Sequence, residues 1–257
     1  MLVYAKKTRR FEYGKKRQIN NKALLRLFVF LCIITIMLAA TSSFFKLKRI
    51  EIEGNRSIPD EEILQVVNHH LGRNTFMIKP ALISEEIKQI LPVKEAKVKL
   101  RLPGTMVIKV EEREIIAALP YLGGFVLIDQ NGYVVKIQSD LKGFRIPIIT
   151  GLEITNPEKA KPISINWKQD LLEDLKKGLK YLSPMKAELS EIHLDYHEGE
   201  VSFFIYTIDG FQIYFEKNDI KEEKFMLLKS VLEDLRKRGM GKGLIDLSRE
   251  APVFKAF

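Results

Sequence analysis

The sequence predicts an α+β protein that is held in a membrane by a single helix and carries two folded domains after it. Three observations support this prediction. An uncharged apolar run covers residues 27–45, a strand, helix, helix, strand, strand pattern follows it, and the second half of the chain combines short strands with leucine-rich helices. The only cysteine, Cys32, lies within the apolar run. The part of the chain after Phe45 must therefore be stabilised by its own core rather than by disulfides.

The apolar run reads LFVFLCIITIMLAATSSFF and has the length of a transmembrane helix. At a rise of about 1.5 Å per residue it measures roughly 28 Å, close to the hydrocarbon thickness of about 30 Å. A cleaved signal peptide is one alternative, because small residues follow Leu38. A buried helix of a soluble domain is another, although such a helix rarely lacks a polar face over five turns. The long basic segment before the run favours a retained anchor.

Residues 1–26 form a basic tail that predicts the orientation of the anchor. They contain nine basic side chains and one acidic side chain, a net charge of +8 out of the +9 of the whole chain. By the positive-inside rule the tail stays in the cytoplasm, in contact with anionic lipid, and the rest is exported. Nucleic-acid binding is the alternative, but the tail lacks a recognisable fold and has no interleaved aromatics beyond Tyr4, Phe11 and Tyr13, so no nucleic acid is expected as a partner.

The first exported domain shows two strand patterns on either side of two helices, followed by a third strand. Residues 46–54 alternate apolar and charged side chains before a glycine, and residues 96–102 and 106–112 do so around a Pro103-Gly104 turn. Ile52 and Val98 are expected to face inward. Ser57 is the expected cap of the first helix. The apolar stripes are Ile63, Val66, Val67 and Leu71 in the first helix and Ile83, Ile87, Ile90 and Leu91 in the second.

The second domain contains two hairpin patterns and two amphipathic helices. Residues 125–129 and 133–137 flank an Asn-Gly turn, and residues 201–206 and 211–215 flank Asp209-Gly210. Residues 192–196 form a further short strand, and a last strand is expected at residues 244–247, at the edge of a sheet. The helical stripes are Leu171, Leu172, Leu175, Leu179 and Leu182 in the first helix and Phe225, Leu228, Val231, Leu232 and Leu235 in the second.

The histidines are the candidates for a metal site. His193 and His197 lie near Asp195, Glu198 and Glu200, a combination that zinc could use, but no third ligand has a reliable spacing. His69 and His70 end a helix, where a cation complements the helix dipole, so a capping role is expected. We therefore predict no metal, no cofactor and no small-molecule substrate.

The sequence contains no recognisable catalytic motif. No GxSxG, HExxH or phosphate-loop pattern is present, so the protein is predicted not to be an enzyme. Gly239, Gly241 and Gly243 follow a helix, whereas a phosphate loop precedes one, so they are expected to stop the helix. The basic residues 236–238 are expected to complete its C-terminus.

The order of elements after residue 45 resembles a POTRA domain, and shorter motifs narrow the resemblance. These motifs are Ile50-x-Ile52-x-Gly54-Asn55-x-x-Ile58, Leu91-Pro92-Val93, Leu102-Pro103-Gly104-Thr105, Ile108-x-Val110-x-Glu112-Arg113, Leu127-Ile128-Asp129-x-x-Gly132-Tyr133-Val134 and Ile146-Pro147-Ile148-Ile149-x-Gly151. With them the chain resembles the FtsQ/DivIB family of bacterial cell division proteins. Leu102 departs from the family pattern, in which many members carry tryptophan.

The resemblance implies a POTRA domain at residues 46–114, a C-terminal FtsQ/DivIB-type domain at 115–250 with a mixed, antiparallel-rich sheet, and a tail at 251–257. It also implies a non-enzymatic divisome scaffold in the inner (cytoplasmic) membrane at the division septum. The partners implied are other single-pass division proteins, FtsB-like or DivIC-like and FtsL-like. Two alternatives are a POTRA-bearing outer-membrane transport or assembly factor and a membrane-anchored cell-wall enzyme. The first would need a barrel and the second a catalytic constellation.

In the family the last strand binds the partner, and this implies where the site lies. An edge strand has unpaired N–H and C=O groups that accept a strand from another protein. The expected partner-binding residues are Leu244, Ile245, Asp246, Leu247 and Ser248, with Phe254 as an additional apolar anchor.

Overall fold

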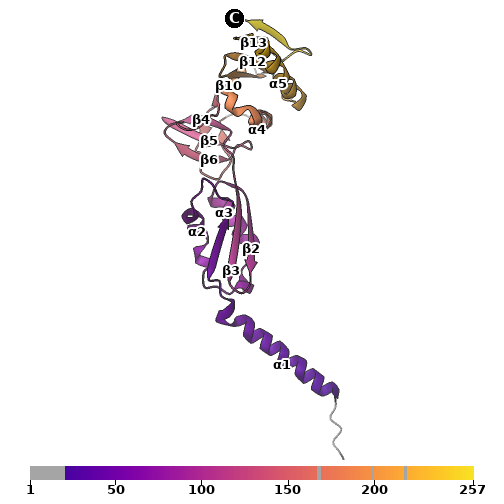
Figure 1. Ribbon diagram of the computed structural model, residues 1–257. Coiled ribbons are helices and arrows are strands. Elements are labelled where there is room, and N and C mark those ends of the chain that lie inside the picture. The colour runs from indigo at the N-terminus through magenta and orange to yellow at the C-terminus, as the bar shows by residue number, and fades with distance from the viewer. Residues whose placement is uncertain (1–20, 167–168, 198–199, 217–218) are drawn as a thin grey trace, which may run out of the picture.

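The computed structural model describes residues 21–166, 169–197, 200–216 and 219–257. Its parts follow one another in chain order along an elongated molecule, with an N-terminal helix at one end and the C-terminus at the other (Figure 1). The basic residues of the tail up to Arg17 lie outside the described residues. The predicted fold class, a long apolar helix followed by two α+β units, is confirmed.

The N-terminal helix, α1 (Asn21–Thr41), is long and apolar enough to cross a membrane. Its most apolar window, Asn21–Leu38, has a mean hydropathy of 2.0 and buries nothing against the rest of the chain. The hydroxyls of Thr35 and Thr41 donate to carbonyls of the preceding turn, so these polar side chains do not need water. The helix begins before Leu27 and ends before Phe45, unlike the predicted run. The helix ends early because Ser42 begins a separate 3₁₀ turn, η1 (Ser43–Phe45). The Ser42 hydroxyl caps this turn by accepting from the Phe44 N–H.

The first domain has the predicted strand, helix, helix, strand, strand order. Its elements are β1 (Arg49–Glu53), α2 (Asp60–Val67), η2 (Asn68–His70), η3 (Thr75–Met77), α3 (Pro80–Ile90), β2 (Val93–Arg101) and β3 (Thr105–Glu112). The sheet order is β1-β3-β2, with β1 parallel and β2 antiparallel to the central β3. The two helices pack on one face of this sheet, where Met106 and Ile108 of β3 are fully buried.

One residue in each predicted helical stripe of the first domain is exposed. Leu71 is 44% exposed and Ile90 is 51% exposed. Leu71 follows η2, where the chain no longer has the α-helical period, and Ile90 is the last residue of α3. The other stripe residues of the first domain are buried: Ile63, Val66, Val67, Ile83, Ile87 and Leu91. The inward faces of both helices were therefore predicted correctly.

Ser57 does not cap α2 as predicted. The residue before α2 is Pro59, which makes no side-chain cap, and the loop before it is held by Glu112 at the end of β3. The Glu112 carboxylate accepts from the backbone N–H groups of Arg56, Ser57 and Ile58 at 2.6–3.0 Å. Burial raises the pKa of Glu112, but these backbone hydrogen bonds outweigh it and hold the pKa below its usual value.

We expect Glu112→Gln to destabilise the first domain by about 1–2 kcal/mol at neutral pH, because the bonded carboxylate loses its charge. A carboxyl whose folded pKa is depressed stabilises the fold at neutral pH and loses that effect as the pH falls through the acidic range. The difference in urea midpoint between the wild type and the variant should therefore narrow at low pH. Glu111→Gln is the control, because the Glu111–Lys94 pair is exposed. A difference that is independent of pH would contradict this role of Glu112.

The second domain is built on one mixed nine-stranded sheet. Its elements are β4 (Ala117–Tyr121), β5 (Gly124–Ile128), β6 (Val134–Gln138), β7 (Ile148–Thr150), β8 (Ile154–Thr155), β9 (Ser164–Ile165), α4 (Gln169–Leu182), η4 (Ser183–Glu188), β10 (Leu189–His197), β11 (Glu200–Thr207), β12 (Phe211–Glu216), α5 (Glu222–Lys237), β13 (Gly243–Asp246) and β14 (Val253–Ala256). The strand order is β14-β13-β12-β11-β10-β7-β4-β5-β6, and β8 and β9 form a separate pair. Both predicted hairpins, β5–β6 and β11–β12, are confirmed.

Helices α4 and α5 share one core with alternate residues of the sheet. Tyr181 of α4 and Phe225 of α5 lie 5.2 Å apart between ring centroids, and Phe225 stacks on Phe215 of β12 at 4.9 Å. The predicted stripe of α4 is buried over its whole length, while in α5 Val231 is only partly buried. The other side chains of β10–β13 form the uncovered face of the sheet.

A buried ion pair joins the two domains. Arg113, just after β3, places its guanidinium 2.6 Å from the Asp129 carboxylate and 3.6 Å above the Tyr133 ring. Asp129 also accepts from the backbone N–H groups of Asn131 and Tyr133 in the β5–β6 turn. Its side chain is 5% exposed and that of Arg113 is 10% exposed. At the end of β3, Glu112 therefore binds a loop of the first domain, and Arg113 binds a turn of the second domain.

Candidate functional site

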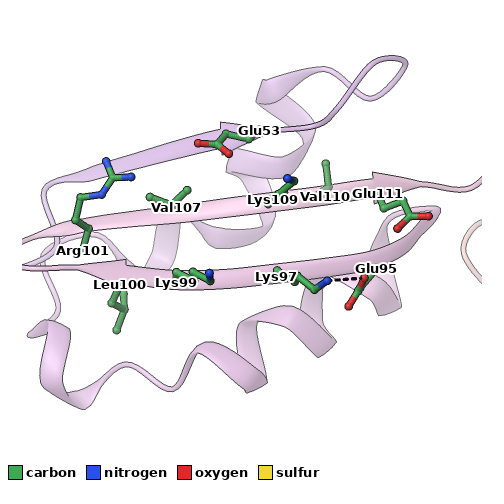
Figure 2. A pocket seen from close by; sticks show the side chains of 10 residues that line it. All are labelled: Glu53, Glu95, Lys97, Lys99, Leu100, Arg101, Val107, Lys109, Val110 and Glu111. Carbon is green, nitrogen blue, oxygen red and sulfur yellow. Dashed lines mark ion pairs between the residues drawn. The ribbon is translucent and has the colours of Figure 1, made fainter.

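The open face of the first sheet carries charged side chains from all three strands. Figure 2 shows these side chains, with Lys97 paired to Glu95. They line a hollow of about 600 Å³, and the Lys97–Glu95 pair measures 3.1 Å. Glu51 pairs with Arg101 at 3.1 Å. These ion pairs join exposed side chains, and pairs of this kind contribute little to stability.

The histidines considered as zinc ligands in the second domain have other contacts. The Nδ1 atom of His193 lies 2.7 Å from the hydroxyl of Thr150, which also donates to Glu191 at 2.5 Å. The ring faces Phe204 of β11. The side chains of His197, Glu198 and Glu200 lie outside the described part of the structure. His193 is therefore a hydrogen-bonded residue of the uncovered sheet face.

His69 and His70 lie in η2 and both face Glu86 of α3. The His69 Nε2 atom is 3.7 Å and the His70 Nε2 atom 3.5 Å from the two Glu86 oxygens. Neither ring nitrogen of His70 has a hydrogen-bond partner, so this ring does not cap the carbonyls of α2 as predicted. Burial lowers the pKa of His70, and the neighbouring His69 lowers it further. These three residues are the group in the described chain that could hold a metal ion.

The basic end of α5 forms ion pairs within the chain. Arg236 contacts Asp209 at 2.7 Å and Glu188 at 2.6 Å. The hydrogen bond to Asp209 raises the pKa of Arg236. Helix α5 ends at Lys237, and Gly239 follows with a positive φ of 68°, a conformation that stops a helix. This arrangement fits the predicted helix stop.

The residues predicted to bind a partner lie in the last two strands and in the turn that follows the first of them. Strand β13 runs parallel to β12, with Ile245 opposite Ile213, and β14 runs antiparallel to β13, with Phe254 opposite Ile245. The chain between them turns back after Asp246, whose carboxylate accepts from both the N–H and the hydroxyl of Ser248. Lys224 of α5 donates to the carbonyls of Leu247 and Arg249 and so holds this turn against the helix.

The prediction that residues 244–248 form the edge of the sheet is wrong. The edge strand is β14, which lies within the residues expected to be a separate tail. Ile245 and Leu247 are fully buried, Leu244, Asp246 and Ser248 are partly exposed, and the Leu247 N–H donates to the Tyr214 carbonyl of β12. The cause is the turn held by Lys224, which brings residues 253–256 alongside β13. Residues 253–257, Val-Phe-Lys-Ala-Phe, do not alternate apolar and polar side chains, so the local sequence gives little signal for β14.

Phe254 packs inward instead of projecting from the tail. Its ring lies 6.2 Å from that of Phe211 and belongs to the margin of the second core. A Cβ atom at Gly243 would come within 2.4 Å of the Phe254 ring, so the glycine leaves room for it. Phe254 therefore anchors β14 to its own domain.

The free edge of β14 can be assigned from the alternation of an antiparallel ladder. The Phe257 N–H donates to the Lys242 carbonyl just before β13 at 3.3 Å. Because neighbouring residues in a strand point their backbone groups in opposite directions, Val253 and Lys255 also face β13. The N–H and C=O groups of Phe254 and Ala256 then face outward. Beside them, Val253 is 44% exposed and Phe257 is 77% exposed.

Comparisons with known proteins cover almost the whole of the two domains. Residues 45–113 match the family model for the FtsQ-type POTRA domain, and residues 117–248 match that for the C-terminal part of the cell division protein FtsQ/DivIB. The second match ends before β14.

Individual proteins similar to this chain are named for the same family. A cell division protein DivIB of Clostridium botulinum (strain Loch Maree) is 25% identical over 248 residues, 93% of each chain. The DivIB of another strain, Hall, is 30% identical over 139 residues, 54% of each chain. The major extracytoplasmic domain of DivIB from Geobacillus stearothermophilus, a solved structure, matches with 16% identity and a TM-score of 0.33, covering 49% of this chain and 97% of that one.

Proposed function

The chain belongs to the FtsQ/DivIB family of bacterial cell division proteins, and on that premise we propose that it is a non-enzymatic, single-pass scaffold that binds other division proteins outside the cytoplasm. The partners proposed are the FtsB-like or DivIC-like and the FtsL-like single-pass proteins. We further propose that the two domains cover residues 46–114 and 115–256, so that β14 is part of the second.

The observation that carries this proposal is the free edge of β14. Its outward N–H and C=O groups at Phe254 and Ala256 can pair with a strand of a partner, which supplies affinity through the main chain. Val253 and Phe257 add exposed apolar surface beside those groups, and such residues can give specificity. The residues first expected at the site, Leu244 to Ser248, then support the edge from behind instead of touching the partner through their backbone.

The test is a pair of substitutions at one position of β14. Ala256→Pro removes an outward N–H and leaves the ladder with β13 in place, because proline is tolerated where the N–H of an edge strand faces away. We expect capture of the co-expressed DivIC-like and FtsL-like proteins of the same organism to fall by about tenfold or more, the effect of about 1.4 kcal/mol.

Ala256→Val is the matched control. It keeps the N–H and favours strand structure, so capture should remain at the wild-type level. The melting temperature of both full-length variants in detergent should stay close to that of the wild type. Equal capture by the proline and valine variants, with both folded, would place the partner elsewhere.

The orientation of the anchor is a second proposal. We expect the mature protein to keep residues 1–45, with its N-terminus in the cytoplasm, because the net charge of +8 precedes the apolar run at residues 27–45. Mass spectrometry of the membrane-extracted protein should find the intact chain, and a reporter fused after Phe257 should be active only outside the cytoplasm. A new N-terminus between residues 41 and 44 would instead identify a signal peptide.

A further inference from the structure

Two neighbouring histidines and a glutamate converge between the helices of the first domain, far from β14 in the chain. His69 and His70 end the α2–η2 segment, and Glu86 lies on α3. The two imidazole rings lie 3.9 Å apart between centroids. One Nε2 atom faces each of the two carboxylate oxygens, and one ligand atom from each residue lies within 4.8 Å of the others.

The separations suit a metal ion better than direct hydrogen bonds. The two N···O distances are 3.7 and 3.5 Å, whereas an N–H···O bond to a carboxylate is about 2.7–2.9 Å. Two ligands of a tetrahedral zinc ion, each at about 2.0–2.2 Å from the metal, lie roughly 3.4 Å apart. The observed distances therefore leave space for an ion between the three side chains.

The surroundings of His70 give a second reason to expect a metal ion at this position. Both of its ring nitrogens are buried, Nδ1 has no partner, and Nε2 has only the 3.5 Å contact with Glu86, which does not meet hydrogen-bond geometry. A buried polar group without a good hydrogen bond destabilises a fold. A metal bound at Nε2 would satisfy one of the two. Arg73 is the nearby cation that opposes such binding, and the negative charge of Glu86 offsets it. His69 is 47% exposed, which leaves an open side for a water ligand.

We propose that His69, His70 and Glu86 bind a divalent transition-metal ion of the zinc class, with a fourth position open to solvent. Two imidazoles and one carboxylate form a three-ligand set that zinc accepts. The ion connects the end of α2 to α3, two elements that are otherwise linked by apolar packing. Its role is to stabilise the first domain, independently of the partner edge.

The test uses the tag-free, full-length protein in detergent, titrated with CoCl₂ and with ZnCl₂. We expect one equivalent of Co²⁺ to give the visible absorption of a tetrahedral site and one equivalent of Zn²⁺ to displace it. Zn²⁺ should also raise the melting temperature by several degrees, because it binds only the folded state. In His70→Gln and Glu86→Gln the affinity should fall by more than about tenfold, since even the outer-shell partners of a metal site contribute about 10–100-fold.

The control is His193→Gln, which removes a histidine from the second domain and should leave the titration unchanged. Melting in EDTA measures whether each variant folds without metal, and His69→Gln, at the most exposed ligand, replaces any variant that does not. The absence of tetrahedral absorption in the wild type would overturn the proposal. Its retention in the folded ligand variants, or its loss in His193→Gln, would do so as well.

Discussion

Asp129→Ala is expected to destabilise the second domain by about 3–5 kcal/mol, because removal of one partner of a buried ion pair leaves the other charge uncompensated. The Arg113 guanidinium contacts the Asp129 carboxylate at 2.6 Å, and both side chains are at least nine-tenths buried. The substitution also removes the acceptor for the N–H groups of Asn131 and Tyr133. The β5–β6 turn therefore loses three hydrogen bonds together.

A double-mutant cycle separates the ion pair from these other contacts. Arg113→Ala, Asp129→Ala and the double variant would be unfolded with urea as full-length proteins and followed by circular dichroism. The double variant should be less destabilised than the sum of the single variants by more than about 1 kcal/mol, because the second substitution removes a charge that the first left unpaired. Strictly additive losses would mean that the pair does not couple the two domains.

Ile108→Asp is expected to unfold the first domain or to destabilise it by about 4 kcal/mol or more, since it places an unpaired carboxylate in the core. Ile108 is fully buried on the central strand β3, where both helices cover it. The domain should lose its resistance to protease while α1 and the second domain keep theirs. Lys109→Asp introduces the same side chain on the exposed face of β3 and should change the stability by less than about 0.5 kcal/mol.

A wild-type melting profile for Ile108→Asp would show that the register of β3 is wrong. The two positions predicted from sequence to face inward, Ile52 and Val98, are weaker tests of that register. Both are only partly buried, because they lie on β1 and β2, the edge strands of the three-stranded sheet. Alternation along a strand predicted their face correctly, but it carries no information about which strand lies in the middle.

Elements that depend on residues close in the chain could be predicted from the sequence, whereas elements that depend on their position in a sheet could not. Periodicity predicted the leucine stripe of α4 and the two Gly-containing hairpins, which depend on neighbours close in the chain. It did not predict that Glu112 binds the loop at residues 56–58, more than fifty residues away. It also did not predict β4 and β7, because β7 pairs in parallel with β4 and β10 and such pairing is decided over long distances.

The candidate partner-binding site shows most directly what local sequence patterns cannot predict. A strand was predicted at residues 244–247, and β13 (Gly243–Asp246) is that strand, but its position in the sheet depends on the residues after it. Strand β14 has only four residues, and it is placed by the turn that Lys224 holds and by the Phe254 ring over Gly243. These tertiary contacts have no local sequence signature. The outward backbone positions could be assigned only once the pairing of Phe257 with Lys242 was known.

Amide hydrogen exchange of β14 with and without a bound partner tests the proposed strand addition most directly. In the free full-length protein the N–H groups of Val253 and Lys255, which face β13, should be protected, and those of Phe254 and Ala256 should exchange rapidly. Binding of the DivIC-like and FtsL-like proteins should slow exchange at Phe254 and Ala256 by at least about tenfold. Stable binding that leaves these two amides as exposed as before would contradict strand addition at β14.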